Sequence, residues 1–213
     1  NKLQNSELFE LNEVFRYTPE IANFVKDLDA AFPAVSVGDD WGAYVGESNL
    51  ENGDKPVLRV YDTQSKMIGS VFDEALKIAG RKTSRAGSVA VLNLSHEMHR
   101  TYRKTIERWQ NRIVNIDGRS TGQVRHKLRN KVVYSLPEYV AGMQFDLVYL
   151  LHVDKATIPP DLPAHLNRGM ISLAYLGATR ARTSLRICVT QDDGGPSPIL
   201  ELPLMRNSLV TAD

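Results

Sequence analysis

The chain has 213 residues, of which 42% are hydrophobic and 24% charged, a composition typical of one globular domain with a sizeable core. Its single cysteine, Cys188, excludes an intramolecular disulfide framework, and no apolar run approaches the ~20 residues that span a bilayer. The N-terminus carries no signal-peptide pattern, so a cytoplasmic protein is expected. The formal net charge of +1 neither indicates nor excludes a nucleic-acid partner.

The predicted elements alternate between helices and strands along most of the chain. In chain order they are a helical region over 6–32, a loop insertion over 38–56, a strand over 57–61, a helix over 67–79, a strand over 89–94, a helix over 95–110, strands over 113–116, 131–135 and 145–153, a helix over 166–182 and a strand over 185–190. Ser95 is expected to cap one helix, and Gly80 to end another. The tail, 195–213, contains one more candidate strand over 199–202 and is expected to fray.

The strands are almost continuous runs of apolar residues, most clearly over 89–94 and 145–153. Strands of this kind, alternating with helices, predict a parallel sheet covered by helices on both faces. The expected fold class is therefore α/β, with residues 1–213 forming one domain. Sheets of this class usually bind ligands at the carboxyl ends of their strands, but many enzymes share that property, so the fold alone does not choose a function.

Several motifs of nucleotide and metal chemistry are missing. The sequence contains no phosphate-binding loop of the form G-x-x-x-x-G-K-[ST], so the chain is not expected to hydrolyse a nucleotide on its own. His96 and His99 lie three residues apart rather than the four of a zinc-protease helix, and no metal site is predicted. The basic stretch 100–131 holds ten lysines and arginines against two acids, and charge alone leaves phosphate contacts and an ordinary solvated surface equally open.

The last third of the chain carries two segments with polar side chains next to apolar strands. Gly142 and Gln144 lie just before one strand, where a turn presents Gln144 at the edge of the sheet. The helix over 166–182 brings Arg180 and Arg182 to the next strand, where an arginine can bind a phosphate through its planar, permanent charge. Alternatively, Arg180 caps its helix and Arg182 is solvated.

These segments resemble motifs of superfamily 1 DNA helicases of the UvrD/Rep type. Motif V usually reads K-G-L-E-F before an apolar strand, and residues 141–145 read A-G-M-Q-F. Motif VI usually reads Y-V-[GA]-[IVL]-T-R-A, and residues 175–181 read Y-L-G-A-T-R-A. The stretch 11–21 resembles motif IV, whose core is an aromatic–arginine pair that leads into a helix. The three motifs follow the family's order and cover the chain from near its start to near its end.

The resemblance implies a RecA-like domain, the second of two motor domains, in a fragment of a larger protein. ATP with Mg²⁺ would bind between this domain and an N-terminal RecA-like domain of the same protein, which supplies the phosphate-binding loop. Arg180 would be an arginine finger on the γ-phosphate, and Arg16 would be its partner. Phe15 would stack on the adenine, and Gln144, together with Gly142, would contact the nucleotide near its ribose.

The same resemblance implies contacts with single-stranded DNA near 135–141. The residues expected to approach the DNA are Ser135, Glu138 and Tyr139, to which the basic stretch adds Arg125, Lys127 and Arg129. The sequence departs from the family's pattern here, because Ala141 replaces the usual lysine and Glu138 lies where a histidine is common. These departures affect the expected DNA contacts more than the expected ATP contacts.

Three functions follow from these observations. The first is the second motor domain of an ATP-dependent DNA helicase, inactive as an isolated chain. The second is a non-catalytic RecA-like module that binds nucleic acid or protein, and a Walker A domain upstream in the natural gene would separate it from the first. The third is a free-standing α/β enzyme that acts on a small phosphorylated substrate through Arg16 and Arg180. The lack of a credible acid, base or nucleophile beside these arginines counts against the third.

Overall fold

The structure is a computed structural model that describes residues 13–14, 16–30, 47–48, 50–80, 88–118, 130–161 and 164–212. Its strands are β1 (Glu13–Val14), β2 (Glu47–Ser48), β3 (Val57–Tyr61), β4 (Val89–Asn93), β5 (Ile113–Ile116), β6 (Val132–Ser135), β7 (Phe145–Leu151), β8 (Ala181–Thr190) and β9 (Val210–Thr211). Its helices are α1 (Pro19–Ala30), α2 (Gln64–Ala79), α3 (His96–Ile106), α4 (Ala164–Ala178) and α5 (Glu201–Met205). Short 3-10 helices are η1 (Glu107–Trp109), η3 (Pro137–Val140) and η4 (Pro198–Leu200).

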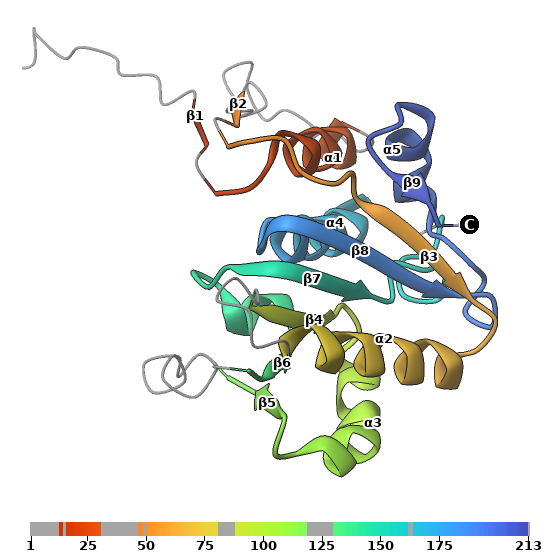
Figure 1. Cartoon of the computed structure of the whole chain (residues 1–213). Coiled ribbons are helices and arrows are strands. Elements are labelled where there is room, and N and C mark those ends of the chain that lie inside the picture. Colours follow the sequence, from red (N-terminus) through yellow and green to blue (C-terminus); the bar gives the residue numbers. More distant parts are fainter. Residues whose placement is uncertain are drawn as a thin grey trace, which may run out of the picture.

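Seven strands form one parallel sheet, and Figure 1 shows helices packed on both of its faces. The strand order is β5-β6-β4-β7-β8-β3-β9, with β7 at the centre, and the neighbouring pairs run parallel. Every residue of β4 is buried, because helices cover both faces of the sheet, and this burial explains the continuous apolar run in the sequence. The predicted α/β fold with a parallel sheet is confirmed.

Two clusters of buried side chains form the core, one on each face of the sheet. The first includes Phe24 of α1 and Ala174 of α4, and the second includes Phe72 of α2. Successive residues of a strand point to opposite faces, so Val148 belongs to the first cluster and Tyr149 to the second. The central strands therefore need apolar residues at every position.

The first predicted helical region is described only in part. Residues 1–12 and most of the loop insertion over 38–56 lie outside the described residues. Within α1, the apolar residues that predicted a helix are all buried, as expected from their spacing: Ile21, Phe24, Val25 and Leu28.

Side-chain caps explain where α2 and α3 begin. Thr63 Oγ1 accepts a hydrogen bond from the backbone N of Lys66 at 3.2 Å, and α2 starts three residues earlier than the sequence predicted. Ser95 Oγ accepts from the backbone N of Met98 at 3.2 Å, which confirms the predicted cap of α3. Gly80 ends α2, as predicted.

The end of α4 corrects the predicted boundary, because the helix stops at Ala178, four residues earlier than expected. The backbone N of Arg180 donates to the carbonyl of Gly177 at 3.1 Å and closes the last turn. The backbone N of Phe145 then donates to the carbonyl of Arg180 at 2.9 Å, so β8 already pairs with β7 at Ala181. The pairing of β8 with β7, two strands that are distant in the sequence, thus ends α4 earlier than the local helical pattern predicts.

The segment after β8 also differs from the prediction. The expected strand over 199–202 is instead η4 followed by α5, because Pro198 and Pro203 have no N–H to give to a strand ladder. The tail does not fray, since Leu209 is buried and β9 pairs with β3.

In the described part of the chain, no helix combines the length and the apolar character needed to cross a membrane.

Candidate functional site

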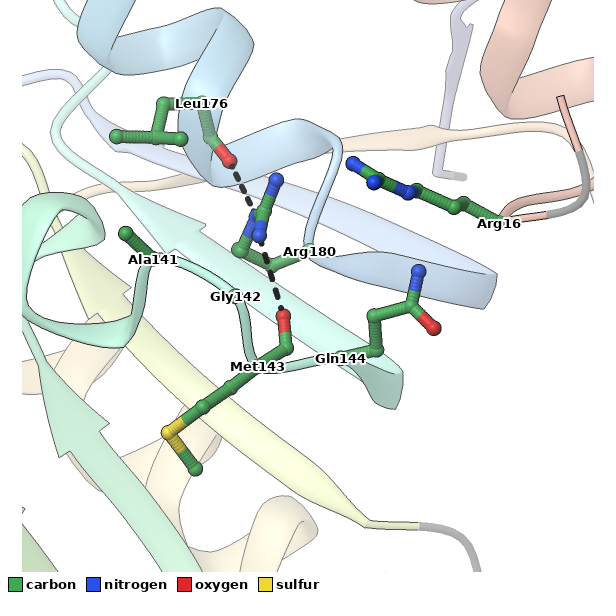
Figure 2. A pocket seen from close by; sticks show the side chains of 7 residues that line it. All are labelled: Arg16, Ala141, Gly142, Met143, Gln144, Leu176 and Arg180. Atoms are coloured by element: carbon green, nitrogen blue, oxygen red, sulfur yellow. Dashed lines mark hydrogen bonds between the residues drawn. The ribbon is translucent and has the colours of Figure 1, made fainter. Parts of the chain in front are cut away.

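The two polar segments singled out in the sequence meet at one edge of the sheet. Residues 141–144 directly precede β7, and Arg180 directly precedes β8, which is paired with β7. The backbone N of Thr18 donates to the carbonyl of Arg182 at 3.0 Å, and this bond holds Arg16, just before α1, at the same edge. Together they form an open pocket of about 610 Å³ (Figure 2), lined by Arg16, Ala141, Gly142, Met143, Gln144, Leu176 and Arg180.

The pocket lies at the amino ends of β7 and β8, opposite to the edge where sheets of this class usually bind ligands. Its polar residues belong to turns that lead into strands, rather than to turns that follow them. The general expectation for α/β sheets therefore does not apply to these residues.

Three hydrogen bonds fix the side chain of Arg180, which is 8% exposed. Its Nε donates to the carbonyl of Leu176 at 3.1 Å, and its Nη1 donates to the carbonyl of Met143 at 3.3 Å. Its Nη2 donates to Oγ1 of Thr179 at 3.1 Å. The contact with Leu176 is the helix cap considered as an alternative, but the contact with Met143 joins the guanidinium to the turn before β7. All three acceptors are neutral oxygens, so none of them compensates the positive charge.

Arg16 and Arg180 concentrate positive charge in this pocket. Burial lowers the pKa of Arg180 below its usual value, and the charge of Arg16 lowers it further. Among the residues that the structure describes, no aspartate or glutamate forms an ion pair with either arginine. Two guanidinium groups without a carboxylate partner favour an anionic ligand, and phosphate oxygens can accept paired hydrogen bonds from arginine.

Tyr17, which no sequence motif marked as a site residue, lies beside the two arginines. Its side chain is buried and forms a hydrogen bond with Tyr175 of α4. Burial raises the pKa of Tyr17, and the neighbouring Tyr175 raises it further, so this phenol stays neutral at ordinary pH. Because Tyr17 follows Arg16 directly, its packing anchors the segment that carries Arg16. That adjacency was the only signal in the sequence.

The turn before β7 shapes the other wall of the pocket. Gly142 has a φ of 85°, in the left-handed region that favours glycine. The next residue, Met143, buries its side chain and turns its carbonyl toward Arg180 (Figure 2). Gln144 is exposed and lines the pocket with its amide. The expected contacts of Gly142 and Gln144 with a nucleotide stay predictions.

The residues expected to contact DNA are described only in part. The predicted site residues outside the described ranges are Phe15, Arg125, Lys127 and Arg129. Ser135 is fully buried, and its hydroxyl donates to the carbonyl of Ile116 at 2.8 Å. The side chain of Ser135 is thus already engaged within the protein, and its burial does not support a contact with DNA.

Glu138 and Tyr139 lie in η3, between β6 and β7. Oε1 of Glu138 lies 2.9 Å from Nε2 of His96, and Tyr139 packs partly buried against the first core cluster. The segment 135–141 contains no lysine or arginine to hold a phosphate. Its contact with DNA stays a prediction that rests on the position of the segment and not on its charge.

The strand order and the two helical layers define the fold class of the protein. The parallel sheet of seven strands with helices on both faces is an α/β fold, consistent with a RecA-like domain. The described residues that meet at its amino edge come from the three segments that the sequence analysis had singled out.

Comparison with known proteins supports the fold. A scan against models of protein families finds no match, and no curated protein matches the sequence. Among solved structures, 44 chains match. One of them is the C-terminal domain of a possible DNA helicase from Lactobacillus plantarum WCFS1, with 17% identity and a TM-score of 0.63, and the match covers 93% of this chain and 99% of that chain. At this identity the likeness shows a shared fold.

Proposed function

We propose that this chain is the second motor domain of an ATP-dependent DNA helicase of the UvrD/Rep type. ATP and Mg²⁺ would bind between it and an N-terminal RecA-like domain of the same protein, which carries the phosphate-binding loop. The observation that carries the proposal is the pair Arg16 and Arg180, which share one open pocket and have no carboxylate partner among the described residues. The fold shared with the C-terminal domain of a possible DNA helicase supports it.

The geometry of Arg180 suits a phosphate that gains negative charge during reaction. Its guanidinium is already fixed by three hydrogen bonds, so little reorganisation is needed when the charge develops. Arg16 is exposed and reaches the pocket from the other side, so the two arginines can contact one phosphate from two directions (Figure 2). Gln144 offers an amide that can donate to and accept from a sugar hydroxyl.

Binding of single-stranded DNA is part of the proposal. Arg100 and Lys104 on α3, and Arg108 on η1, are exposed members of the basic stretch 100–131. Exposed cations of this kind attract the sugar-phosphate backbone without preference for sequence, and such binding weakens as salt is added.

The test is the ATPase activity, stimulated by single-stranded DNA, of the natural full-length protein that contains these residues. Arg180→Ala is expected to lower kcat by about a thousandfold, with nucleotide binding largely kept. Arg16→Ala is expected to lower kcat by about a hundredfold, because one charge-assisted donor is lost. Arg182→Ala is the matched control, since Arg182 is exposed and pairs with Asp146 at 3.4 Å. Its loss should change kcat by less than about twofold.

A second variant separates lost chemistry from lost folding, because Arg180→Ala also removes three hydrogen bonds. Arg180→Lys keeps the positive charge without the planar fork, and kcat is still expected to fall by at least about tenfold. Unchanged turnover in a folded Arg180 variant would contradict the motor proposal, as would a full-length protein without a nucleotide site. Either result favours the non-catalytic binding module.

A further inference from the structure

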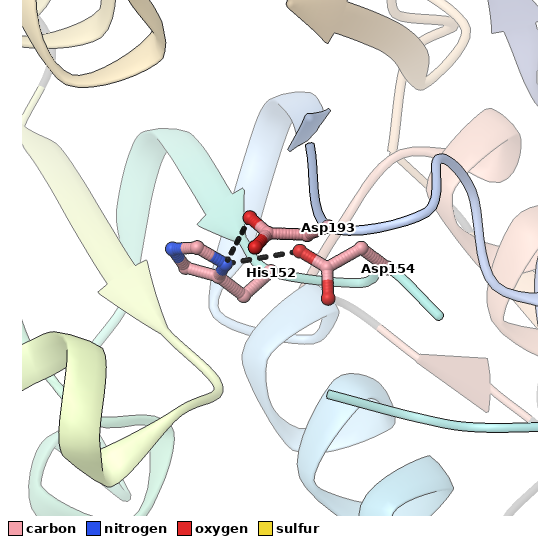
Figure 3. Close-up of side chains that lie close together, drawn as sticks. All are labelled: His152, Asp154 and Asp193. Carbon is pink, nitrogen blue, oxygen red and sulfur yellow. Dashed lines mark hydrogen bonds and ion pairs between the residues drawn. The ribbon is translucent and has the colours of Figure 1, made fainter. Parts of the chain in front are cut away.

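A second group of polar side chains lies at the opposite edge of the sheet, where β7 and β8 end. His152 directly follows β7, Asp154 lies two residues further on, and Asp193 belongs to the turn after β8. Figure 3 shows both carboxylates facing the same ring nitrogen. Oδ2 of Asp154 is 2.9 Å from Nδ1 of His152, and Oδ2 of Asp193 is 3.6 Å from it. The three ligand atoms lie within 4.8 Å of one another.

Each carboxylate is oriented by partners of its own. Oδ1 of Asp154 accepts from the backbone N of Thr157 at 2.9 Å, which leaves Oδ2 turned toward the imidazole. Asp193 accepts from Oγ1 of Thr190 at 2.5 Å and from Nε2 of Gln64 at 2.9 Å. Residues of α2, of β8 and of the segment after β7 thus hold the two carboxylates in place.

The other ring nitrogen of His152 is held by Tyr102 of α3. Nε2 lies 2.8 Å from the hydroxyl oxygen of Tyr102. Nδ1 forms a hydrogen bond with Oδ2 of Asp154, which requires a proton on Nδ1. A cation that binds Nδ1 takes the place of this proton, and Nε2–H can then donate to the hydroxyl oxygen of Tyr102. Histidines that bind a metal usually have their second ring nitrogen fixed by such a partner.

The two carboxylates lack a sufficient countercharge. His152 and Asp154 are buried, and the side chain of Asp193 is 15% exposed. In the part of the chain that the structure describes, no lysine or arginine forms an ion pair with Asp154 or Asp193. A protonated imidazole leaves one net negative charge, and a neutral imidazole leaves two. Uncompensated charge in a buried place is costly, so this cluster favours a cation.

We propose that His152, Asp154 and Asp193 form a binding site for a divalent cation. One imidazole nitrogen and two carboxylate oxygens suit Mn²⁺ or Zn²⁺ better than Mg²⁺, which prefers oxygen ligands alone. The partly exposed Asp193 gives the cation a route from solvent, and water completes its coordination. The bound cation offsets the two negative charges and ties the end of β7 to the turn after β8.

This cation site is structural and separate from the proposed nucleotide site. The pocket of Arg16 and Arg180 lies at the amino ends of β7 and β8, whereas the cation site lies at their carboxyl ends. Either proposal can fail without affecting the other.

The experiment uses the 213-residue chain after removal of metal with a chelator. Calorimetry with Mn²⁺ or Zn²⁺ is expected to show one saturable site, and Tm is expected to rise by about 5–10 °C at roughly 100 times Kd. Asp193→Asn keeps the shape of the side chain but removes one charged ligand, and it should weaken binding by at least about tenfold. Asp192→Asn is the matched control, because this neighbouring carboxylate is exposed, and it should bind the metal like the wild type.

The absorption spectrum of bound Co²⁺ gives a second readout, which is expected in the wild type and lost in His152→Gln. If His152→Gln does not fold, Asp193→Asn still tests the proposal. Asp193 is partly exposed, so its substitution disturbs the fold less. Absence of saturable binding, or equal affinity of Asp193→Asn and the wild type, would overturn the proposal and leave His152 in a hydrogen-bonded network only. Loss of binding in His96→Gln would overturn it as well, because His96 pairs with Glu138 and does not belong to the cluster.

Discussion

Arg180 and Arg182 show how far two similar residues can differ when only one position separates them. Arg180 is buried and held by the carbonyls of Leu176 and Met143, whereas Arg182 is exposed and pairs with Asp146. The sequence made both of them candidates for phosphate binding, because the direction of a side chain cannot be read where a helix gives way to a strand. The structure places Arg180 in the pocket with Arg16, and Arg182 serves as its control.

The reactivity of Cys188 can also be predicted from its surroundings. Cys188 is fully buried in β8, and this burial raises the pKa of its thiol to about 12. A disulfide reagent such as DTNB should therefore modify the native chain about a thousandfold more slowly than the unfolded chain. Because the chain has one cysteine, the released chromophore reports this residue alone. Rapid modification without denaturant would show that β8 opens readily or that the burial is incomplete.

Helix α4 contains two glycines that differ in how closely other side chains approach them. A Cβ at Gly177 would lie 2.6 Å from Cδ1 of Leu150 and 3.4 Å from Cγ of Pro137, whereas a Cβ at Gly169 would meet nothing within 4 Å. Gly177→Ala should therefore lower the free energy of unfolding by about 1–3 kcal/mol through overpacking. Gly169→Ala should raise it by about 0.5–1 kcal/mol, because alanine favours a helix more than glycine does.

Denaturation by urea measures both glycine variants. A rise in the free energy of unfolding in both variants would mean that helix propensity, and not the close approach of α4 to β7, decides the role of Gly177. The control is internal, since both substitutions add the same methyl group to the same helix.

The boundaries of elements were predicted well where local patterns decide them. The strands β3 and β5 have the predicted bounds, and Ser95 caps α3 as expected, because apolar runs and caps depend on neighbouring residues. The end of α4 was predicted wrongly, because Arg180 is drawn into pairing with the start of β7. The segment after β8 was also predicted wrongly, since Pro198 and Pro203 favour helical turns over a strand there.

At the scale of the whole molecule, the two proposed sites occupy opposite edges of one sheet. The length of β7, seven residues, separates them by about 20 Å. The effects of Arg180→Ala and Asp193→Asn on the free energy of unfolding should therefore add within about 0.5 kcal/mol in the presence of a chelator. A double-mutant cycle by urea denaturation measures this sum, and a coupling above about 1 kcal/mol would show that the sheet transmits strain between its edges.

The sequence by itself determined the parallel α/β fold, because strands buried on both faces require unbroken apolar runs. It also singled out Gly142, Gln144, Arg16 and Arg180, since these residues lie in short motifs next to predicted elements. The tertiary structure alone decided which of the polar side chains meet. It brought Arg16 to Arg180 across the edge of the sheet, and it brought His152 to Asp193 through the pairing of β7 with β8. These contacts join residues that are distant in the chain, and they depend on strand order and register, which no local pattern encodes.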